Sequence, residues 1–145
     1  TFKDITINFL FQFVNQKNVN ASFFSGMPGT FRNQPTAVLD RWQNSGDNAT
    51  YQQFTNGGNL EVAQAFTRFG QSDAAITDAS YIRLKNVSIS YKLPSKWTFG
   101  SNCNVFIEGQ NLFTITSYNG PDPEFTTEGF LPPLRILSAG INLTF

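Results

Sequence analysis

The chain has 145 residues and no formal net charge, because ten basic residues balance ten acidic ones. A nucleic-acid-binding domain usually carries a basic surplus, so we expect no nucleic-acid partner. Charged residues make up only 14% of the chain although 16 phenylalanines are present, which is unlike an average soluble domain. With no histidine and a single cysteine, the chain offers too few ligands for a zinc, copper or haem site, and we expect no cofactor.

The first strand is predicted over about residues 3–15, where apolar and polar side chains alternate. One face carries Ile5, Ile7, Phe9, Phe11 and Phe13, and the other carries Asp4, Thr6, Asn8 and Gln12. A length of about eleven residues suits a tilted strand that crosses a bilayer. Because the alternation starts almost at the first residue, we expect the chain to begin inside a larger protein.

The second strand is predicted over residues 80–93 and ends before Pro94, since proline cannot donate to a ladder. Its apolar face carries Val87, Ile89, Tyr91 and Leu93, and its polar face carries Asn86, Ser88, Ser90 and Lys92. Near the start the pattern reverses, because Arg83 and Lys85 fall on the apolar face. This reversal predicts that the strand rises above the membrane there.

The third and fourth strands are predicted over residues 104–115 and 135–145. In the third, Val105 and Ile107 alternate with Glu108 and Gln110, and a glutamate facing inward is natural in a water-filled lumen but costly in a dry core. The fourth strand alternates in the same way and ends on the aromatic Phe145.

The connections between these strands differ in length. A short turn, 94–103, joins the second and third strands, whereas long loops span residues 16–79 and 116–134. Short periplasmic turns and long extracellular loops are the layout of outer-membrane barrels. Within the first loop, residues 35–42 are expected to form a short helix, with Pro35 in its first turn.

The expected fold class is therefore an all-β, transmembrane antiparallel barrel. Four strands leave two unpaired edges, and unpaired backbone groups cost several kcal/mol each in lipid. Single-chain barrels begin at about eight strands, so we expect this chain either to be one piece of a larger barrel or to pack its apolar faces as a soluble sandwich.

Several motifs also occur in a particular order along the chain. They are residues 8–12 (NFLFQ), 39–42 (LDRW), 46–51 (GDNATY), 78–87 (DASYIRLKNV), 90–94 (SYKLP), 105–114 (VFIEGQNLFT), 118–124 (YNGPDPE) and 140–145 (GINLTF). Together they resemble the SusC/RagA family of TonB-dependent outer-membrane transporters. One departure is the Gln52-Gln53 pair after Tyr51, where the family often continues with proline and arginine.

The resemblance implies that the chain is the C-terminal four strands of a plugged barrel of about 22 strands. It also implies TonB-dependent import of oligosaccharides or peptides across the bacterial outer membrane, with a SusD-like surface lipoprotein as a lid. Further expected partners are TonB, the barrel-assembly machinery and outer-membrane lipid. We expect no catalysis, because a serine–histidine arrangement is impossible without histidine.

Four groups of residues are candidates for function. The C-terminal Ile141, Leu143 and Phe145 resemble the signal read by the barrel-assembly machinery, and they also suit a lipid-facing strand end. Tyr91 and Trp97 are candidates for an aromatic girdle near the short turn. Trp42, Tyr51 and Tyr118 are candidates for loop contacts with ligand or lid, and packing within the loops is the alternative. The residues expected to face the lumen are Asn8, Gln12, Ser88, Ser90, Glu108 and Gln110.

Two other protein classes fit the same pattern of strands. A passive outer-membrane barrel or adhesin would share the architecture without a plug. A soluble, carbohydrate-binding β-sandwich would instead bury its apolar faces against each other.

Overall fold

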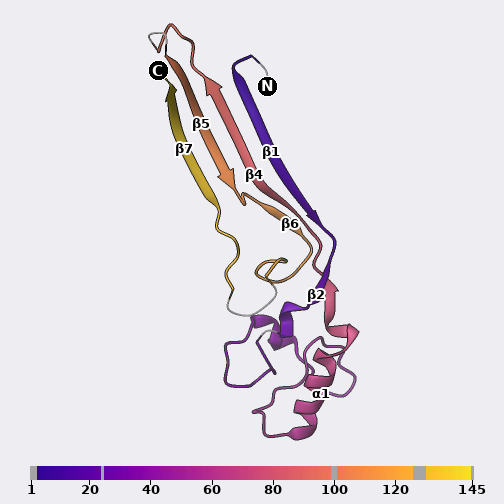
Figure 1. Cartoon of the computed structure of the whole chain (residues 1–145). Helices are drawn as coiled ribbons and strands as arrows, with labels where there is room; N and C mark the ends of the chain where they lie inside the picture. Colours follow the sequence, from indigo (N-terminus) through magenta and orange to yellow (C-terminus); the bar gives the residue numbers. More distant parts are fainter. Residues whose placement is uncertain (1–2, 24, 99–100, 126–129, 145) are drawn as a thin grey trace. The chain divides into compact units, whose positions relative to one another are not determined.

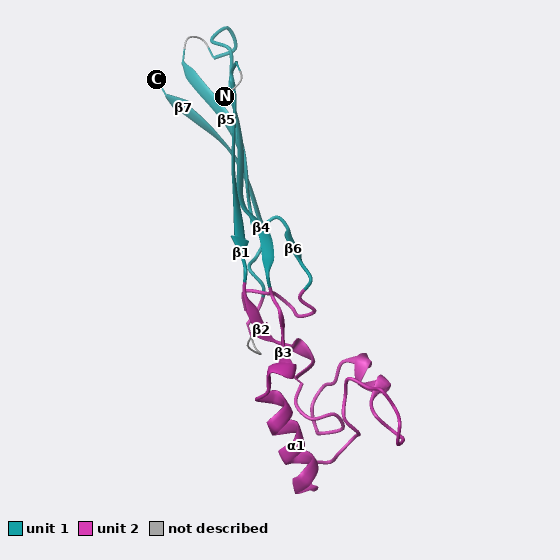
Figure 2. Cartoon of the chain, turned by 90° about the vertical axis from the view of Figure 1, so that its right-hand side faces the viewer, with its two compact units in different colours: residues 1–15, 80–117, 132–145 teal, residues 16–79, 118–131 magenta. Residues whose placement is uncertain are grey.

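The computed structural model describes residues 3–23, 25–98, 101–125 and 130–144. The chain divides into two compact units. Unit 1 comprises residues 1–15, 80–117 and 132–145, and unit 2 comprises residues 16–79 and 118–131 (Figure 2). Within the described residues, no helix combines the length and the hydropathy required to span a membrane.

Unit 1 is an antiparallel sheet in which each long strand pairs with the next long strand along the chain (Figure 1). Its order is β1-β4-β5-β7, and a short strand, β6, also pairs with β4. The strands are β1 (Ile5–Val14), β4 (Tyr81–Lys92), β5 (Asn102–Gln110), β6 (Thr114–Thr116) and β7 (Ile136–Thr144). The fold is therefore mostly β, and each long strand overlaps one of the four alternating segments, although β5 begins at Asn102, before the segment 104–115.

The register of this sheet separates apolar from polar side chains. Ile7, Ile89, Ile107 and Ala139 form one row across the four long strands. Directly beside it, Asn8, Ser88, Glu108 and Ser138 form the next row. Because successive residues of a strand point to opposite faces, the two rows lie on opposite sides of the sheet.

A β-bulge in β4 corrects the expectation for Arg83 and Lys85. Leu10 of β1 pairs with Asn86, but Phe11 pairs with Leu84, so Lys85 is an extra residue without a partner on β1. The extra residue reverses the alternation, and Arg83 pairs with Gln12 on the polar face. Arg83 therefore does not lie on the apolar face, as the sequence predicted, whereas the rise of the strand above the membrane stays a prediction.

On the other side of β4, the expected third strand is interrupted close to this bulge. Residues 104–115 were expected to be one strand, but β5 ends at Gln110 and β6 begins at Thr114. Asn111 adopts a positive φ of 51°, a conformation that asparagine tolerates better than most residues. The Asn111 amide donates to the carbonyl of Lys85 at 2.9 Å, which keeps the backbone paired through the interruption.

Unit 2 combines one α-helix with short elements. Strands β2 (Lys17–Val19) and β3 (Ile76–Asp78) pair antiparallel. The helices are α1 (Leu60–Gly70) and the 3₁₀ turns η1 (Ala21–Phe23), η2 (Thr36–Asp40) and η3 (Asp73–Ala75). The short helix expected over residues 35–42 is the 3₁₀ turn η2, with Pro35 as its N-cap.

Helix α1 is fixed at its start by Asn59. The Asn59 side-chain oxygen accepts hydrogen bonds from the backbone amides of Glu61 at 3.0 Å and Val62 at 3.3 Å. These bonds satisfy two of the amides that a helix N-terminus leaves without partners. Glu61 in the first turn and Arg68 in the last turn also complement the helix dipole.

Candidate functional site

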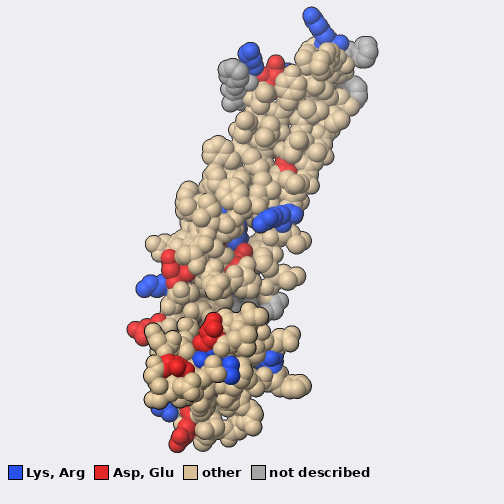
Figure 3. Space-filling model, turned by 180° about the vertical axis from the view of Figure 1, so that it is seen from behind, with Lys and Arg blue, Asp and Glu red and all other residues tan. Residues whose placement is uncertain are grey.

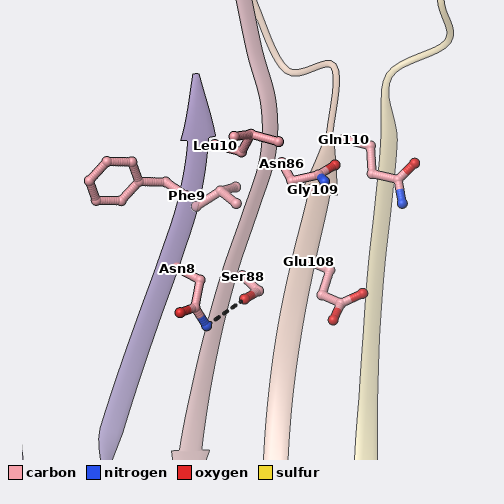
Figure 4. Close-up of a pocket in the computed structure, with 9 residues that line it drawn as sticks. Asn8, Phe9, Leu10, Asn86, Ser88, Glu108, Gly109 and Gln110 are labelled. Atoms are coloured by element: carbon pink, nitrogen blue, oxygen red, sulfur yellow. Dashed lines mark hydrogen bonds between the residues drawn. The ribbon is translucent and has the colours of Figure 1, made fainter. Parts of the chain in front are cut away.

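The polar face of unit 1 forms a shallow groove of about 330 Å³ across β1, β4 and β5. Asn8, Ser88 and Glu108 lie side by side in it (Figure 4), and the Asn8 side-chain nitrogen donates to the Ser88 hydroxyl at 3.3 Å. Gln110 lines the next part of the groove. Glu108 is the one ionisable group among the lining residues, so the surface is polar but nearly uncharged.

The register brings all the residues expected to face a lumen to this polar face. Ser90 lies in the row of Thr6 and Phe106, and Gln12 lies opposite Arg83. Their common face follows from the pairing, whereas their exposure to a water-filled lumen stays a prediction.

Arg83 is a residue of this face that the sequence analysis misplaced. Its side chain is only 1% exposed, and its Nε donates to the Thr114 hydroxyl at 2.8 Å. Its guanidinium carbon also lies 5.0 Å from the centre of the Tyr81 ring. A buried charge requires such partners, because desolvation is otherwise costly. On the neighbouring strand β1, the side-chain oxygen of Gln12, the residue paired with Arg83, is buried without a hydrogen-bond partner among the described residues.

Phe106 is an aromatic residue on this otherwise mainly polar face, which also carries Leu10 and Ile136. It pairs with Gly140 of β7, and a Cβ atom on that glycine would lie 2.5 Å from the ring Cζ. The absence of a side chain at Gly140 therefore allows the aromatic ring to lie over the neighbouring strand.

The opposite face of unit 1 is apolar and exposed. Large side chains on every long strand remain accessible, including Phe9 (68%), Ile107 (60%), Leu137 (74%) and Ile141 (66%). Strands β1 and β7 contain no charged residue. Figure 3 shows that charged side chains are sparse over the sheet and gather away from its middle. Such a surface is unstable in water unless lipid or other protein covers it.

Aromatic residues lie toward both ends of the apolar face. Tyr91 is in register with Ile5 near the short turn, and Trp97 within that turn is 71% exposed. At the other end the Phe11 ring contacts those of Phe13, at 6.4 Å, and Phe113, at 6.2 Å. The role of Tyr91 and Trp97 as a girdle stays a prediction.

The distance between these ends fits a membrane. Ile5 and Phe13 are eight residues apart on β1, which corresponds to about 27 Å along a strand. A tilt of roughly 40° reduces this to about 21 Å along the membrane normal, close to the apolar band of about 25 Å in known barrels.

The expected assembly signal lies only partly within the described residues. Ile141 and Leu143 are on the apolar face of β7, opposite Val105 and Cys103. Phe145 lies outside the described residues, so the assembly role stays a prediction.

Two of the three loop aromatics come together in unit 2. Trp42 and Tyr51 line a pocket of about 350 Å³, and the Trp42 amide donates to the Tyr51 carbonyl at 2.8 Å. Between them, one Asp47 oxygen accepts from the amides of Asn44 at 2.8 Å and Gln43 at 3.0 Å. The hydrogen bonds from Asn44 and Gln43 hold the pKa of Asp47 below its ordinary value.

Helix α1 supplies the wall of this pocket that the sequence analysis missed. Phe66 and Phe69 of α1 line it, and their ring centres lie 5.8 and 5.1 Å from that of Phe23. The helical spacing of Val62, Phe66 and Phe69 after Asn59 was the available signal.

Tyr118 lies apart from that pocket and is 6% exposed. Its hydroxyl donates to the carbonyl of Val19 at 2.9 Å, and burial raises its pKa. A Cβ atom on Gly120 would overlap the Tyr118 ring. Tyr118 therefore packs inside unit 2, where it presents little surface to a ligand.

Comparisons with known proteins agree with this architecture. No protein-family model matches the chain. TonB-dependent receptor P3 of Formosa agariphila is 33% identical over 88 residues, which is 48% of this chain and 9% of that receptor. TonB-dependent receptor P39 of the same species is 27% identical over 99 residues, covering 66% of this chain and 9% of the receptor.

Solved structures of the RagAB peptide importer share the fold. The open-open state matches 98% of this chain and 16% of its own, with a TM-score of 0.72 and 22% identity. The closed-closed state matches 99% of this chain and 16% of its own, again with a TM-score of 0.72 and 22% identity. The chain thus spans about a tenth of the curated relatives and about a sixth of the solved chains. These matches confirm the resemblance drawn from the sequence motifs.

Proposed function

We propose that the chain is a segment of a TonB-dependent receptor of the outer membrane, that the full-length receptor imports oligosaccharides or peptides, and that unit 1 forms part of its barrel wall. The observation that carries this proposal is the two-faced sheet. One face is apolar and exposed on all four long strands, and the other is polar with Glu108 in its groove. A wall between lipid and a water-filled lumen requires this combination.

The two outer strands support the closure of a larger barrel. In the described part of the sheet, β1 pairs only with β4, and β7 pairs only with β5. In lipid, the unpaired backbone groups along these edges would each cost several kcal/mol. We therefore propose that strands from the rest of the receptor pair with β1 and β7, completing a plugged barrel of about 22 strands.

Unit 2 is proposed to face the outside of the cell and to meet a SusD-like lipoprotein lid. Support comes from large apolar side chains on its surface, such as Phe31, Leu60 and Leu131 (82% exposed). Contact with the lid would remove these apolar groups from water, which is favourable. TonB would supply the energy for import, and the barrel-assembly machinery would insert the receptor.

The curated relatives are named as receptors and the solved relatives as importers, so we propose transport without catalysis. The β-sandwich alternative requires a second sheet against the apolar face. Ile7, at 55% exposed, and Leu137, at 74%, have no such cover among the described residues. A passive barrel or adhesin differs from the proposal in one testable respect, because it would not depend on TonB.

The experiment compares uptake in three strains of the source bacterium: wild type, a strain without the receptor gene, and a strain without TonB. Labelled oligosaccharides and peptides are offered separately. Import should be lost in both mutants and return when the receptor gene is restored. Uptake that needs the receptor but continues without TonB would identify a passive barrel, and unchanged uptake of every substrate would contradict import.

A further inference from the structure

The pocket of unit 2 is built from four separate parts of the chain. Helix α1 contributes Phe66 and Phe69, the turn around η1 contributes Phe23, Pro28 follows in the next turn, and the loop from Trp42 to Gln52 forms the rest. The aromatic rings of the first two segments contact each other, which gives the pocket a continuous apolar wall.

The loop that forms the remaining wall is held in place by its own hydrogen bonds. The backbone bond between Trp42 and Tyr51 joins its ends, and Asp47 fixes the turn between them. Trp42 nevertheless remains 37% exposed and Phe69 remains 42% exposed. The aromatic surface is therefore positioned before any ligand arrives, which reduces the entropy lost on binding.

One polar group in the pocket lacks a partner. Gln52 lines the pocket, and its side-chain nitrogen is buried with no hydrogen bond to any described residue. An unsatisfied buried donor is costly, and it would gain from a ligand that carries an acceptor oxygen. No lysine, arginine, aspartate or glutamate lines the pocket, so the ligand group it suits is uncharged.

These features favour a peptide over a sugar. At about 350 Å³ the pocket is near the lower end of the range for ligand sites, roughly 300–1,000 Å³. A sugar ring would stack its C–H face on these aromatic rings, but it would also bring several hydroxyl groups into the pocket, where Gln52 offers one buried donor without a partner among the described residues. An apolar side chain next to a peptide carbonyl provides both an apolar body and one acceptor.

We propose that the pocket of unit 2 binds an apolar or aromatic side chain of a peptide, with the adjoining peptide carbonyl accepting a hydrogen bond from Gln52. The inference rests on the proposed import function, and it selects peptides from the two substrate classes. Trp42, Phe66 and Phe69 would hold the side chain through aromatic contacts.

The test uses the full-length receptor, purified in detergent, and isothermal titration calorimetry. The probes are N-acetylated, C-amidated Gly-Phe-Gly and Gly-Ser-Gly, with maltose as the sugar. Gly-Phe-Gly should bind at least tenfold more tightly than Gly-Ser-Gly, because the apolar side chain supplies most of the contact area. Maltose should not compete with it.

Two variants test the named contacts. Gln52→Met keeps the length of the side chain but removes the donor, and it should weaken binding of Gly-Phe-Gly about fivefold. Trp42→Ala should weaken it at least tenfold. The matched controls are Gln53→Met, the exposed neighbouring glutamine, and Phe31→Ala, a fully exposed aromatic outside the pocket. Both controls should bind as the wild type does.

Four results would overturn the proposal: no binding of Gly-Phe-Gly to the wild type, equal binding of the two peptides, unchanged binding in Gln52→Met and Trp42→Ala, or displacement of the peptide by maltose. If the receptor fails this peptide-binding test, TonB-dependent uptake is still expected, because uptake does not require this pocket. Conversely, loss of TonB dependence with normal peptide binding would contradict only the import function.

Discussion

Placing an arginine at Leu137 tests the orientation of the sheet. Leu137 is 74% exposed on the apolar face of β7 and lies in register with Gly109. Through β5 and β4, this row continues to Val87 and Phe9. Phe9 is four residues from Ile5 and four from Phe13 along β1, so the row lies midway across the apolar band.

The expected magnitude follows from this depth. An arginine facing lipid at the bilayer midplane costs about 2–4 kcal/mol, which shifts the folding equilibrium by a factor of roughly 30–900. The neighbouring Ser138→Arg places the same charge on the polar face, where we expect a cost within about 0.5 kcal/mol. Ile141→Arg, closer to the end of the band, should cost about 0–1 kcal/mol.

The assay is urea unfolding of the full-length receptor variants in lipid vesicles, followed by the electrophoretic shift between folded and unfolded barrels. Outer-membrane levels of the same variants give a second measurement in cells. The reasoning is refuted if Leu137→Arg and Ser138→Arg are equally stable. It is also refuted if Ser138→Arg is the more damaging, because that would place lipid on the polar face.

Three further predictions concern the loops and the C-terminus. Asp47→Ala should speed hydrogen exchange at the two loop amides that Asp47 holds. The same loosening should occur in the wild type as the pH falls below the ordinary carboxyl pKa of 3.8 and through the lowered pKa of Asp47, since a depressed pKa stabilises the fold only while the group is ionised. Gly120→Ala should displace the Tyr118 ring and cost about 1–3 kcal/mol, measured as faster proteolysis of unit 2, and wild-type resistance to protease would contradict this. Deleting Phe145 should lower the amount of folded receptor in the outer membrane, and unchanged surface levels would disprove its role in assembly.

The sequence predicts the strands well because their signal is local. A period of two over residues such as Ile5, Ile7 and Phe9 needs no knowledge of the partner strand, and β1 occupies that segment. The bulge at Lys85 was misread because an inserted residue and an altered environment produce the same reversal of alternation.

The pocket formed by the loops could not be predicted from the sequence in this way. Trp42 and Tyr51 could be singled out as exposed aromatics, but their common pocket depends on Phe66 from α1 and Phe23 from η1. No local pattern brings three segments together, since that arrangement is set by tertiary packing. Tyr118 illustrates the same limit, because its burial depends on contact with Val19, far away in the sequence.

The most direct test of the central claim measures the surroundings of two adjacent side chains on β5. Spin labels are attached singly at Ile107 and at Glu108 in the full-length receptor, after its own cysteines, Cys103 included, have been replaced. In lipid vesicles, the label at Ile107 should collide mainly with oxygen, which concentrates in lipid, and the label at Glu108 mainly with a water-soluble nickel chelate. Equal collision rates at the two positions, or the reverse pattern, would contradict a barrel wall with its apolar face against lipid.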